Sequence, residues 1–329
     1  MCFLHTFNRI VIKKGGARRK KLANRGEVWY NRERKEAFIL KKGVIFALIT
    51  AVLFATLEPV SKQIAGEVSP FAITFWRFFI GSFVLLPPAL SKLRCEKIRI
   101  TGRDIAVTAA LGVLFICISM SALQLAVKTA DAPSLIAIIF SANSVFTIVF
   151  AVMLLGEKLT RNKLLALLFG VVGVLLCVDF SSGTNLSSVA LALLAAVSFS
   201  LYTALSQRFN QKLGGVVQTA LVFLFGSIVL FAVLCLTGET LFPAISGQTL
   251  GIMLYLGLFV TGVGYAAYFH AIHKGGPIMA SLAFFIKPIL TPFVSWFVNG
   301  IVPDITVFFA VLCIVLASIF AVQKRKEGM

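Results

Sequence analysis

The sequence predicts an all-α membrane protein with ten transmembrane helices, arranged as two inverted five-helix repeats. Three observations support this fold class: an excess of apolar residues, a one-sided distribution of basic residues and an internal sequence repeat. Hydrophobic residues make up 59% of the chain, charged residues make up 13%, and the mean hydropathy is +0.95. A soluble domain is nearer half apolar and a quarter charged, so this composition indicates many membrane spans.

The first 42 residues are basic and polar, with 13 Lys and Arg against 3 Glu. They lack the apolar core and the small-residue cleavage site of a secretory signal. We interpret residues 1–42 either as a disordered basic tail in the cytoplasm or as the product of a start assigned too far upstream. The second interpretation rests on the sequence from Leu40 onward, which looks like a normal protein start with the initiator decoded as leucine.

Ten apolar segments follow, each close to the 20 residues that a helix needs to cross the hydrocarbon core. Lipid offers no hydrogen-bond partner to the backbone, so each segment is expected to be helical. We place them at residues 43–64, 70–90, 104–126, 133–155, 162–179, 187–207, 216–236, 249–271, 278–298 and 304–322.

Basic residues in the connecting loops predict the orientation of these spans. With the N-terminus inside, every inner loop carries Lys or Arg, whereas the outer loops hold only Lys128. The inner loops are residues 91–103, 156–161, 208–215 and 272–277. Cytoplasmic loops are enriched in Lys and Arg, so we expect a multi-pass protein of the cell membrane with both termini in the cytoplasm.

The chain also repeats itself at a constant spacing. "ALITAVLF" at 47–54 recurs as "ALLAAVSF" at 192–199, and "FFIGSFVL" at 78–85 recurs as "FLFGSIVL" at 223–230, each 145 residues later. The pairs Leu111-Gly112 and Leu256-Gly257 have the same spacing. We therefore predict one repeat at 43–179 and a second at 180–329, which includes a short basic tail. Because five is an odd number of spans, the second repeat enters the membrane from the opposite side.

Five segments carry a resemblance to a known family. They are "TFWRFFIG" (74–81), "SVFTIVFAVMLLGEKLT" (144–160), "FGVVGVLL" (169–176), "YAAYFHAIHKGGPIMASL" (265–282) and "KPILTPFVSWF" (287–297). In this order they resemble the EamA-like transporter family of the drug/metabolite transporter superfamily, over about 43–322. The resemblance implies a ten-helix bundle that moves small metabolites, often outward, by alternating access.

Two departures from the family pattern set the halves apart. The family usually has Gly-Glu after the fourth helix of each half; here Gly156-Glu157 matches, but the second copy reads Asn299-Gly300-Ile301. The proline of the second half, Pro288, has Ser144 as its counterpart in the first. We therefore expect an asymmetric site.

Lys287 and Asn143 are the leading candidates for a substrate site. Lys287 lies about nine residues into its span, near the midplane, and aligning Ser144 with Pro288 places Asn143 opposite Lys287 in the repeat. Ionisable residues inside a membrane are costly and mark substrate or ion pathways. The alternative is that Lys287 has a fixed structural counter-ion and that Asn143 joins two helices by a hydrogen bond.

Glu58 and Arg77 form a second group, each roughly 10 Å below the outer surface by the rise of a helix. They are expected to pair across adjacent helices, as a structural clamp or an outer gate, with substrate contact as the alternative. Lys62 is four residues after Glu58 on the same helical face and competes for it. Trp76 is interpreted as an aromatic residue at the membrane interface.

The remaining candidates have weaker signals. Four polar residues are candidates for the cavity wall and substrate contact: Tyr202, Tyr265, Tyr268 and Gln124. Pro288 and Pro292 are expected to kink their helix and to let it rock, because proline removes a backbone hydrogen bond. Glu157 is assigned to a helix cap or to a brace of the inner gate.

Together these residues predict a secondary transporter of a small polar metabolite, and the resemblance to the EamA-like family implies that it is an exporter. The substrate is expected to be amino-acid-like or to carry a carboxylate or phosphate, because Lys287 and Arg77 outnumber Glu58. The alternative is a channel or a lipid-translocating protein without a carrier cycle. A coupling proton or ion and a homodimer are left open, and the bilayer itself is a partner.

Other classes of function find no support in the sequence. No metalloprotease, hydrolase or phosphate-loop motif is present, so we do not expect an enzyme. The six cysteines and three histidines are scattered, which predicts neither a metal site nor a cofactor. The basic residues lie in the tail and the short loops and form no basic face, which argues against nucleic-acid binding.

Overall fold

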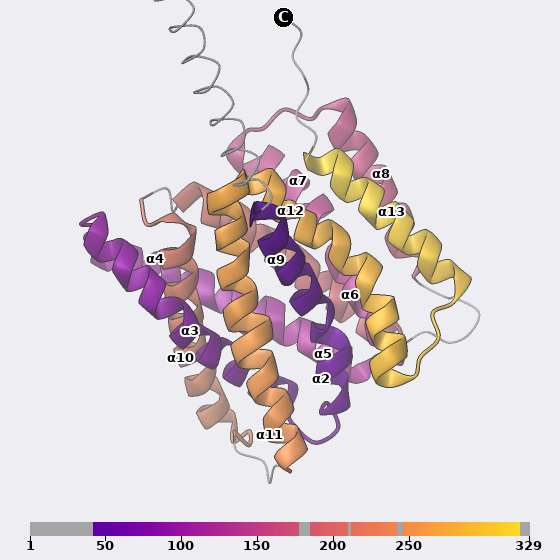
Figure 1. The fold of residues 1–329 in the computed structure, drawn as a ribbon, viewed down its shortest axis with the longest axis horizontal. Coiled ribbons are helices and arrows are strands. Elements are labelled where there is room, and N and C mark those ends of the chain that lie inside the picture. The colour runs from indigo at the N-terminus through magenta and orange to yellow at the C-terminus, as the bar shows by residue number, and fades with distance from the viewer. Residues whose placement is uncertain (1–41, 178–184, 210–211, 242–245, 323–329) are drawn as a thin grey trace, which may run out of the picture.

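The computed structural model describes residues 42–177, 185–209, 212–241 and 246–322, and within 275–281 only the backbone. Nearly all of the predicted tail, 1–42, therefore lies outside the described residues. Every regular element in the described ranges is a helix, as the sequence predicts. Figure 1 shows these helices packed as a bundle.

The helices follow the predicted spans closely. The first segment, Lys42–Gln63, is interrupted by a turn at Thr56, after which α2 (Leu57–Gln63) begins. The first half continues with α3 (Pro70–Cys95), α4 (Gly102–Gly112), the π-helix η1 (Val113–Met120), α5 (Ser121–Thr129), α6 (Pro133–Ser141), α7 (Asn143–Leu155) and α8 (Arg161–Leu176). The second half has α9 (Leu186–Phe209), α10 (Gly214–Thr237), α11 (Gly247–Leu254), the π-helix η2 (Tyr255–Val263), α12 (Gly264–Asn299) and α13 (Ile305–Val322).

Local sequence explains where several helices begin and end. Thr101 caps α4 and forms a capping box with Asp104, and the Ser246 hydroxyl accepts a hydrogen bond from the backbone of Thr249 at the start of α11. Glycine with a positive φ ends α7 at Gly156 (69°) and α12 at Gly300 (72°), a conformation that other residues adopt at a cost.

Eight described segments are long and apolar enough to cross a membrane. They are Lys42–Gln63, Pro70–Cys95, Gly102–Thr129, Pro133–Leu155, Leu186–Phe209, Gly214–Thr237, Gly247–Lys274 and Leu282–Asn299. The other two predicted spans coincide with α8, which has 16 residues, and with α13, whose apolar part is also shorter than 18 residues. The protein is thus a multi-pass membrane protein.

One predicted loop is helical. Residues 272–277 belong to α12, although the chain turns back on itself within this element, as Figure 1 shows. We expected a loop because Gly275-Gly276-Pro277 disfavours a helix interior. The helix nevertheless continues through Pro277, where proline removes one backbone hydrogen bond.

The two halves pack reciprocally through their second and third helices. Helix α3 packs on η2, and α10 packs on α4 and η1. Glycine makes the close approach possible: a Cβ added to Gly112 would lie 2.7 Å from the backbone nitrogen of Gly226, and one added to Gly257 would lie 2.9 Å from Cβ of Ile80. Small residues allow this kind of backbone contact between membrane helices. Helices α8 and α13 lie side by side at one edge of the bundle (Figure 1).

Candidate functional site

A small cavity lies at the centre of the bundle, where residues of both halves meet. Its volume is about 40 Å³, which leaves room for only about three water molecules. Its polar wall consists of Arg77, Ser141, Asn143, Thr261, Tyr265 and Lys287. Its aromatic wall includes Phe54, Phe140, Phe199 and Phe284. In this conformation the cavity is too small to hold a metabolite.

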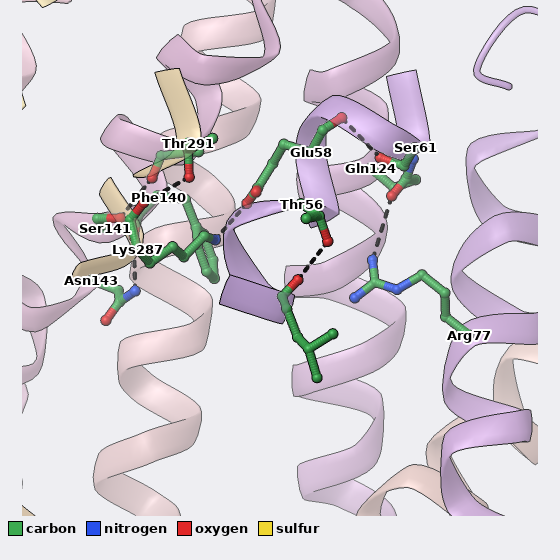
Figure 2. Close-up of polar contacts among 12 residues, drawn as sticks. Thr56, Glu58, Ser61, Arg77, Gln124, Phe140, Ser141, Asn143, Lys287 and Thr291 are labelled. Carbon is green, nitrogen blue, oxygen red and sulfur yellow. Dashed lines mark hydrogen bonds and ion pairs between the residues drawn. The ribbon is translucent and has the colours of Figure 1, made fainter. Parts of the chain in front are cut away.

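Lys287 forms a buried ion pair with Glu58 across the two halves. Its Nζ lies 2.6 Å from Glu58 Oε1, and the exposed fractions are 4% for Lys287 and 0% for Glu58 (Figure 2). Lys287 comes from α12, whereas Glu58 is the second residue of α2, directly after the turn at Thr56. The second carboxylate oxygen of Glu58 is buried and has no hydrogen-bond partner among the described residues.

Arg77 lines the same cavity, and among the described residues it hydrogen-bonds to no acidic side chain. Its exposed fraction is 3%, and its Nε donates to Thr261 Oγ1 at 3.4 Å. Its Nη1 donates to Gln124 Oε1 at 3.5 Å, a contact drawn in Figure 2. The expected pair of Glu58 with Arg77 is therefore wrong: within the part of the chain that the structure describes, the carboxylate is paired only with Lys287.

Lys62 does not compete for Glu58 either. Its Nζ donates to the backbone carbonyls of Lys128 and Ala130, at 3.0 and 2.5 Å. Lys62 thus satisfies carbonyl groups at the end of α5, where a cation is favourable next to the helix C-terminus. It is a structural contact between α2 and the loop that follows α5.

Asn143 lies at a break in the fourth span, where Ala142 separates α6 from α7. Its Nδ2 donates to the carbonyl of Phe140 at 2.8 Å, and its own carbonyl accepts a hydrogen bond from Ser200 Oγ at 2.7 Å. Asn143 contributes to the cavity wall opposite Lys287 without bonding to it. The breaks at Thr56 and Ala142 therefore both lie next to the central cavity.

Pro288 and Pro292 are buried within α12, which continues through both of them. The hydroxyl of Thr291 donates to the carbonyl of Lys287 at 2.8 Å. Proline removes one backbone hydrogen bond at each position, so this part of α12 has fewer bonds to hold it straight.

The other predicted residues divide into two groups. Tyr265 lines the cavity, and its ring centroid lies 5.1 Å from that of Phe54. Outside the lining lie Tyr202, Tyr268, Gln124, Trp76 and Glu157. Gln124 still contacts the site through Arg77. Trp76 donates to the carbonyl of Leu241 at 3.0 Å and Glu157 pairs with Lys163 at 2.7 Å, both as structural contacts.

Sequence reasoning missed Thr261, which holds Arg77 in place. Thr261 lies in η2, and its hydroxyl also donates to the carbonyl of Leu256, five residues earlier. π-Helical segments are frequent at functional sites because the extra residue redirects side chains. Charged residues within spans were selected because burying a charge in the membrane is costly. Thr261 is uncharged, so this criterion does not select it, and no other signal in the sequence could have found it.

A larger cavity of about 240 Å³ lies between α6, α8, α9 and α13, beside Asp131 and Asp304. No predicted site residue lines it. Among the described residues, no group of three or more His, Cys, Asp or Glu could hold a metal ion. The central cavity is therefore the candidate site.

Comparisons with known proteins fit this arrangement. A model of the EamA-like transporter family matches residues 41–178 and, a second time, residues 186–323. An uncharacterized transporter of Clostridium kluyveri is 34% identical over 298 residues, which cover 88% of this chain and 96% of the relative. An S-adenosylmethionine uptake transporter of Rickettsia bellii is 21% identical, with 87% of this chain and 95% of the relative covered.

A solved crystal structure shares the fold at a TM-score of 0.60 and 19% identity, covering 86% of this chain and 96% of the other. The family match extends over nearly the whole described chain, and both relatives are named as transporters. The protein therefore belongs to the EamA-like transporter family.

Proposed function

We propose that this transporter is a secondary carrier that moves a small metabolite with a negatively charged group outward across the cell membrane by alternating access. The observation that carries the proposal is the buried Glu58–Lys287 ion pair, which joins the two halves beside a cavity that Arg77 and Asn143 also line. Buried ionisable residues at the midplane, between two repeats, are typical of carrier binding sites. Whether or not it is amino-acid-like, the proposed substrate has more carboxylate groups than positive charges.

The architecture of this proposal is ten membrane-crossing helices in two inverted halves. The two family matches begin at 41 and 186, which is the spacing of 145 residues found in the sequence repeat. The caps of the third helices, Thr101 and Ser246, have the same spacing. We include α8 and α13 as the last span of each half, because they pack together and Ser144 on the neighbouring α7 contacts Ser318 at 3.2 Å.

The orientation is tested by labelling single cysteines in a variant that lacks the six natural ones. Val302 is 73% exposed in the predicted outer loop, and Cys95 is exposed at the predicted inner end of α3. An impermeant maleimide is expected to label V302C in intact cells, and a restored Cys95 only after the membrane is opened. Labelling of Cys95 in intact cells would contradict cytoplasmic termini.

Alternating access requires the central cavity to grow beyond its volume of about 40 Å³. The breaks at Thr56 and Ala142 and the prolines of α12 provide places where helices bend with few backbone bonds to break. In this proposal the halves rock about these points.

The charge of the site argues against S-adenosylmethionine, the substrate named for the Rickettsia relatives. That molecule has a sulfonium and an ammonium group against one carboxylate, so it is a net cation. Two cationic side chains and one anionic side chain surround the cavity, which repels a net cation. We therefore expect a substrate with a net negative charge.

The test compares cells that overproduce the protein with cells that carry the empty vector. We expect mass spectrometry to find at least one carboxylate-bearing metabolite enriched in the medium of the overproducing cells. The purified protein in proteoliposomes should then exchange that compound by counterflow and should not exchange S-adenosylmethionine. Flux without counterflow would favour a channel, and exchange of only cations would contradict the proposed substrate class.

A further inference from the structure

The charges at the central cavity do not cancel. Among the described residues that line the cavity or bond to its walls, three are charged: Lys287 and Arg77 are cationic, and Glu58 is anionic. Lys287 Nζ lies 2.6 Å from Glu58 Oε1, so these two charges neutralise each other. One positive charge is left, and it belongs to Arg77.

Arg77 is held only by neutral groups. An arginine has five N–H donors, and the structure engages one on Nε and one on Nη1, with acceptors 3.4 and 3.5 Å away. Both distances are at the long end for such bonds. The face of Phe78 lies 5.0 Å from the centre of the guanidinium and adds a weak attraction. The remaining donors of Arg77 have no acceptor within the described ranges.

A second donor without a partner lies beside Arg77. Gln124 has an exposed fraction of 1%, and its Oε1 accepts the hydrogen bond from Arg77 while its Nε2 has no partner in the described structure. A buried polar group without a partner is costly, and a buried charge without a counter-ion is more costly still. An anion in the cavity would supply a counter-ion to Arg77, which lines it.

We propose that the anionic group of the substrate binds Arg77, which lines the cavity, while Lys287 stays paired with Glu58 and keeps the two halves joined. The planar guanidinium matches the two oxygens of a carboxylate, which a lysine ammonium does not. The site then accepts one net negative charge. This inference rests on the proposed carrier function and changes its sequence-based form, in which Lys287 was the leading residue.

The rest of the wall suits an apolar body next to the charged group. The rings of Phe54 and Phe284 lie 6.1 Å apart, and both line the cavity with Tyr265. A matched series of phenyl compounds therefore makes a suitable set of probes. These are 3-phenylpropionate, which is a monoanion, its neutral amide 3-phenylpropionamide, and phenylsuccinate, which is a dianion at neutral pH.

The experiment measures binding of radiolabelled 3-phenylpropionate to the purified full-length protein in detergent micelles, with the other two compounds as competitors. We expect the wild type to bind the monoanion and to bind the amide roughly 100-fold more weakly, since the amide leaves the guanidinium unpaired. The dianion should also bind more weakly than the monoanion.

Two variants separate Arg77 from Lys287. R77Q removes the uncompensated charge, whereas E58Q/K287M removes a cation and an anion together and keeps the net charge of the wild type. We expect R77Q to weaken monoanion binding roughly 100-fold, and E58Q/K287M to weaken it less than about tenfold. R77K keeps the positive charge but replaces the planar guanidinium by a single ammonium group. We expect its affinity for the monoanion to lie between the affinities of R77Q and E58Q/K287M.

The outcomes distinguish the inference from the function on which it rests. Retained binding in R77Q together with loss in E58Q/K287M would overturn the inference alone, because Lys287 would then hold the anion. No binding of the monoanion by the folded wild type would overturn both the inference and a carboxylate substrate. If R77Q does not fold, as judged by size-exclusion chromatography, E58Q/K287M decides: loss of binding there overturns the inference.

Discussion

Replacing Lys287 by methionine is expected to lower the free energy of unfolding by about 3–5 kcal/mol, the usual cost of leaving one member of a buried ion pair without the other. Glu58 is completely buried, and within the described structure Lys287 is the only cation paired with it. In K287M the carboxylate must take up a proton or remain buried without a partner. Denaturant unfolding of the purified protein, followed by tyrosine and tryptophan fluorescence, measures the change.

The double variant E58Q/K287M distinguishes loss of a partner from loss of packing. It removes both charges, so we expect it to recover most of the stability lost in K287M. The matched control is K163M, which breaks the ion pair of Lys163 with Glu157 in the loop before α8. Glu157 is half-exposed, so this change should stay within about 1 kcal/mol. An E58Q/K287M variant as unstable as K287M would contradict an energetic role for the pair.

Replacing Gly112 by leucine is the second change with a large expected effect. A Cβ at this position would lie 2.7 Å from the nitrogen and 2.9 Å from the Cα of Gly226, which is backbone and cannot move aside as a side chain can. Overpacking commonly costs 1–3 kcal/mol, and we expect G112L to cost about 3 kcal/mol or more, because α4 and α10 must separate. Thermal unfolding in micelles and the yield of monodisperse protein measure it.

The matched control for G112L is G251L. Gly251 lies in α11, in the third span of the second half and six residues before Gly257, the counterpart of Gly112; a Cβ there would meet nothing within 4 Å. Leucine favours a helix more than glycine does, so G251L should keep or slightly raise the unfolding temperature. Equal losses in both variants would show that any large residue in these third helices is harmful and that the glycine contact is not the cause.

Most of the fold was predictable because membrane helices follow simple rules. Runs of apolar residues located the helices, and the segment predicted at 133–155 coincides with Pro133–Leu155. The break at Thr56 has a local signal that the sequence reasoning did not use: Pro59, in the first turn of α2, has no N–H to bond the carbonyl of Ala55. The break at Ala142 was not predictable, because neither proline nor glycine lies next to it.

The candidate site was predictable as a set of residues but not as a set of contacts. Charged residues are costly inside a membrane, so the charged residues within the predicted spans were selected as candidates. Three of them, Lys287, Glu58 and Arg77, do lie at or beside the central cavity. Their pairing was wrongly assigned because Glu58 and Arg77 are close in the sequence, whereas Lys287 lies 229 residues away from Glu58 and meets it only through the packing of α12 against α2. Pairing depends on which helices become neighbours, and that information is not local.

The Glu58–Lys287 pair also has an electrical consequence. A single charge that crosses the membrane field gains or loses about 2.3 kcal/mol for every 100 mV, which would let the membrane potential hold a lone buried lysine on one side. The pair is neutral as a whole, so its movement with the rocking halves does no net work against that potential. The response of this transporter to voltage then depends on Arg77 and on the charge that its substrate brings.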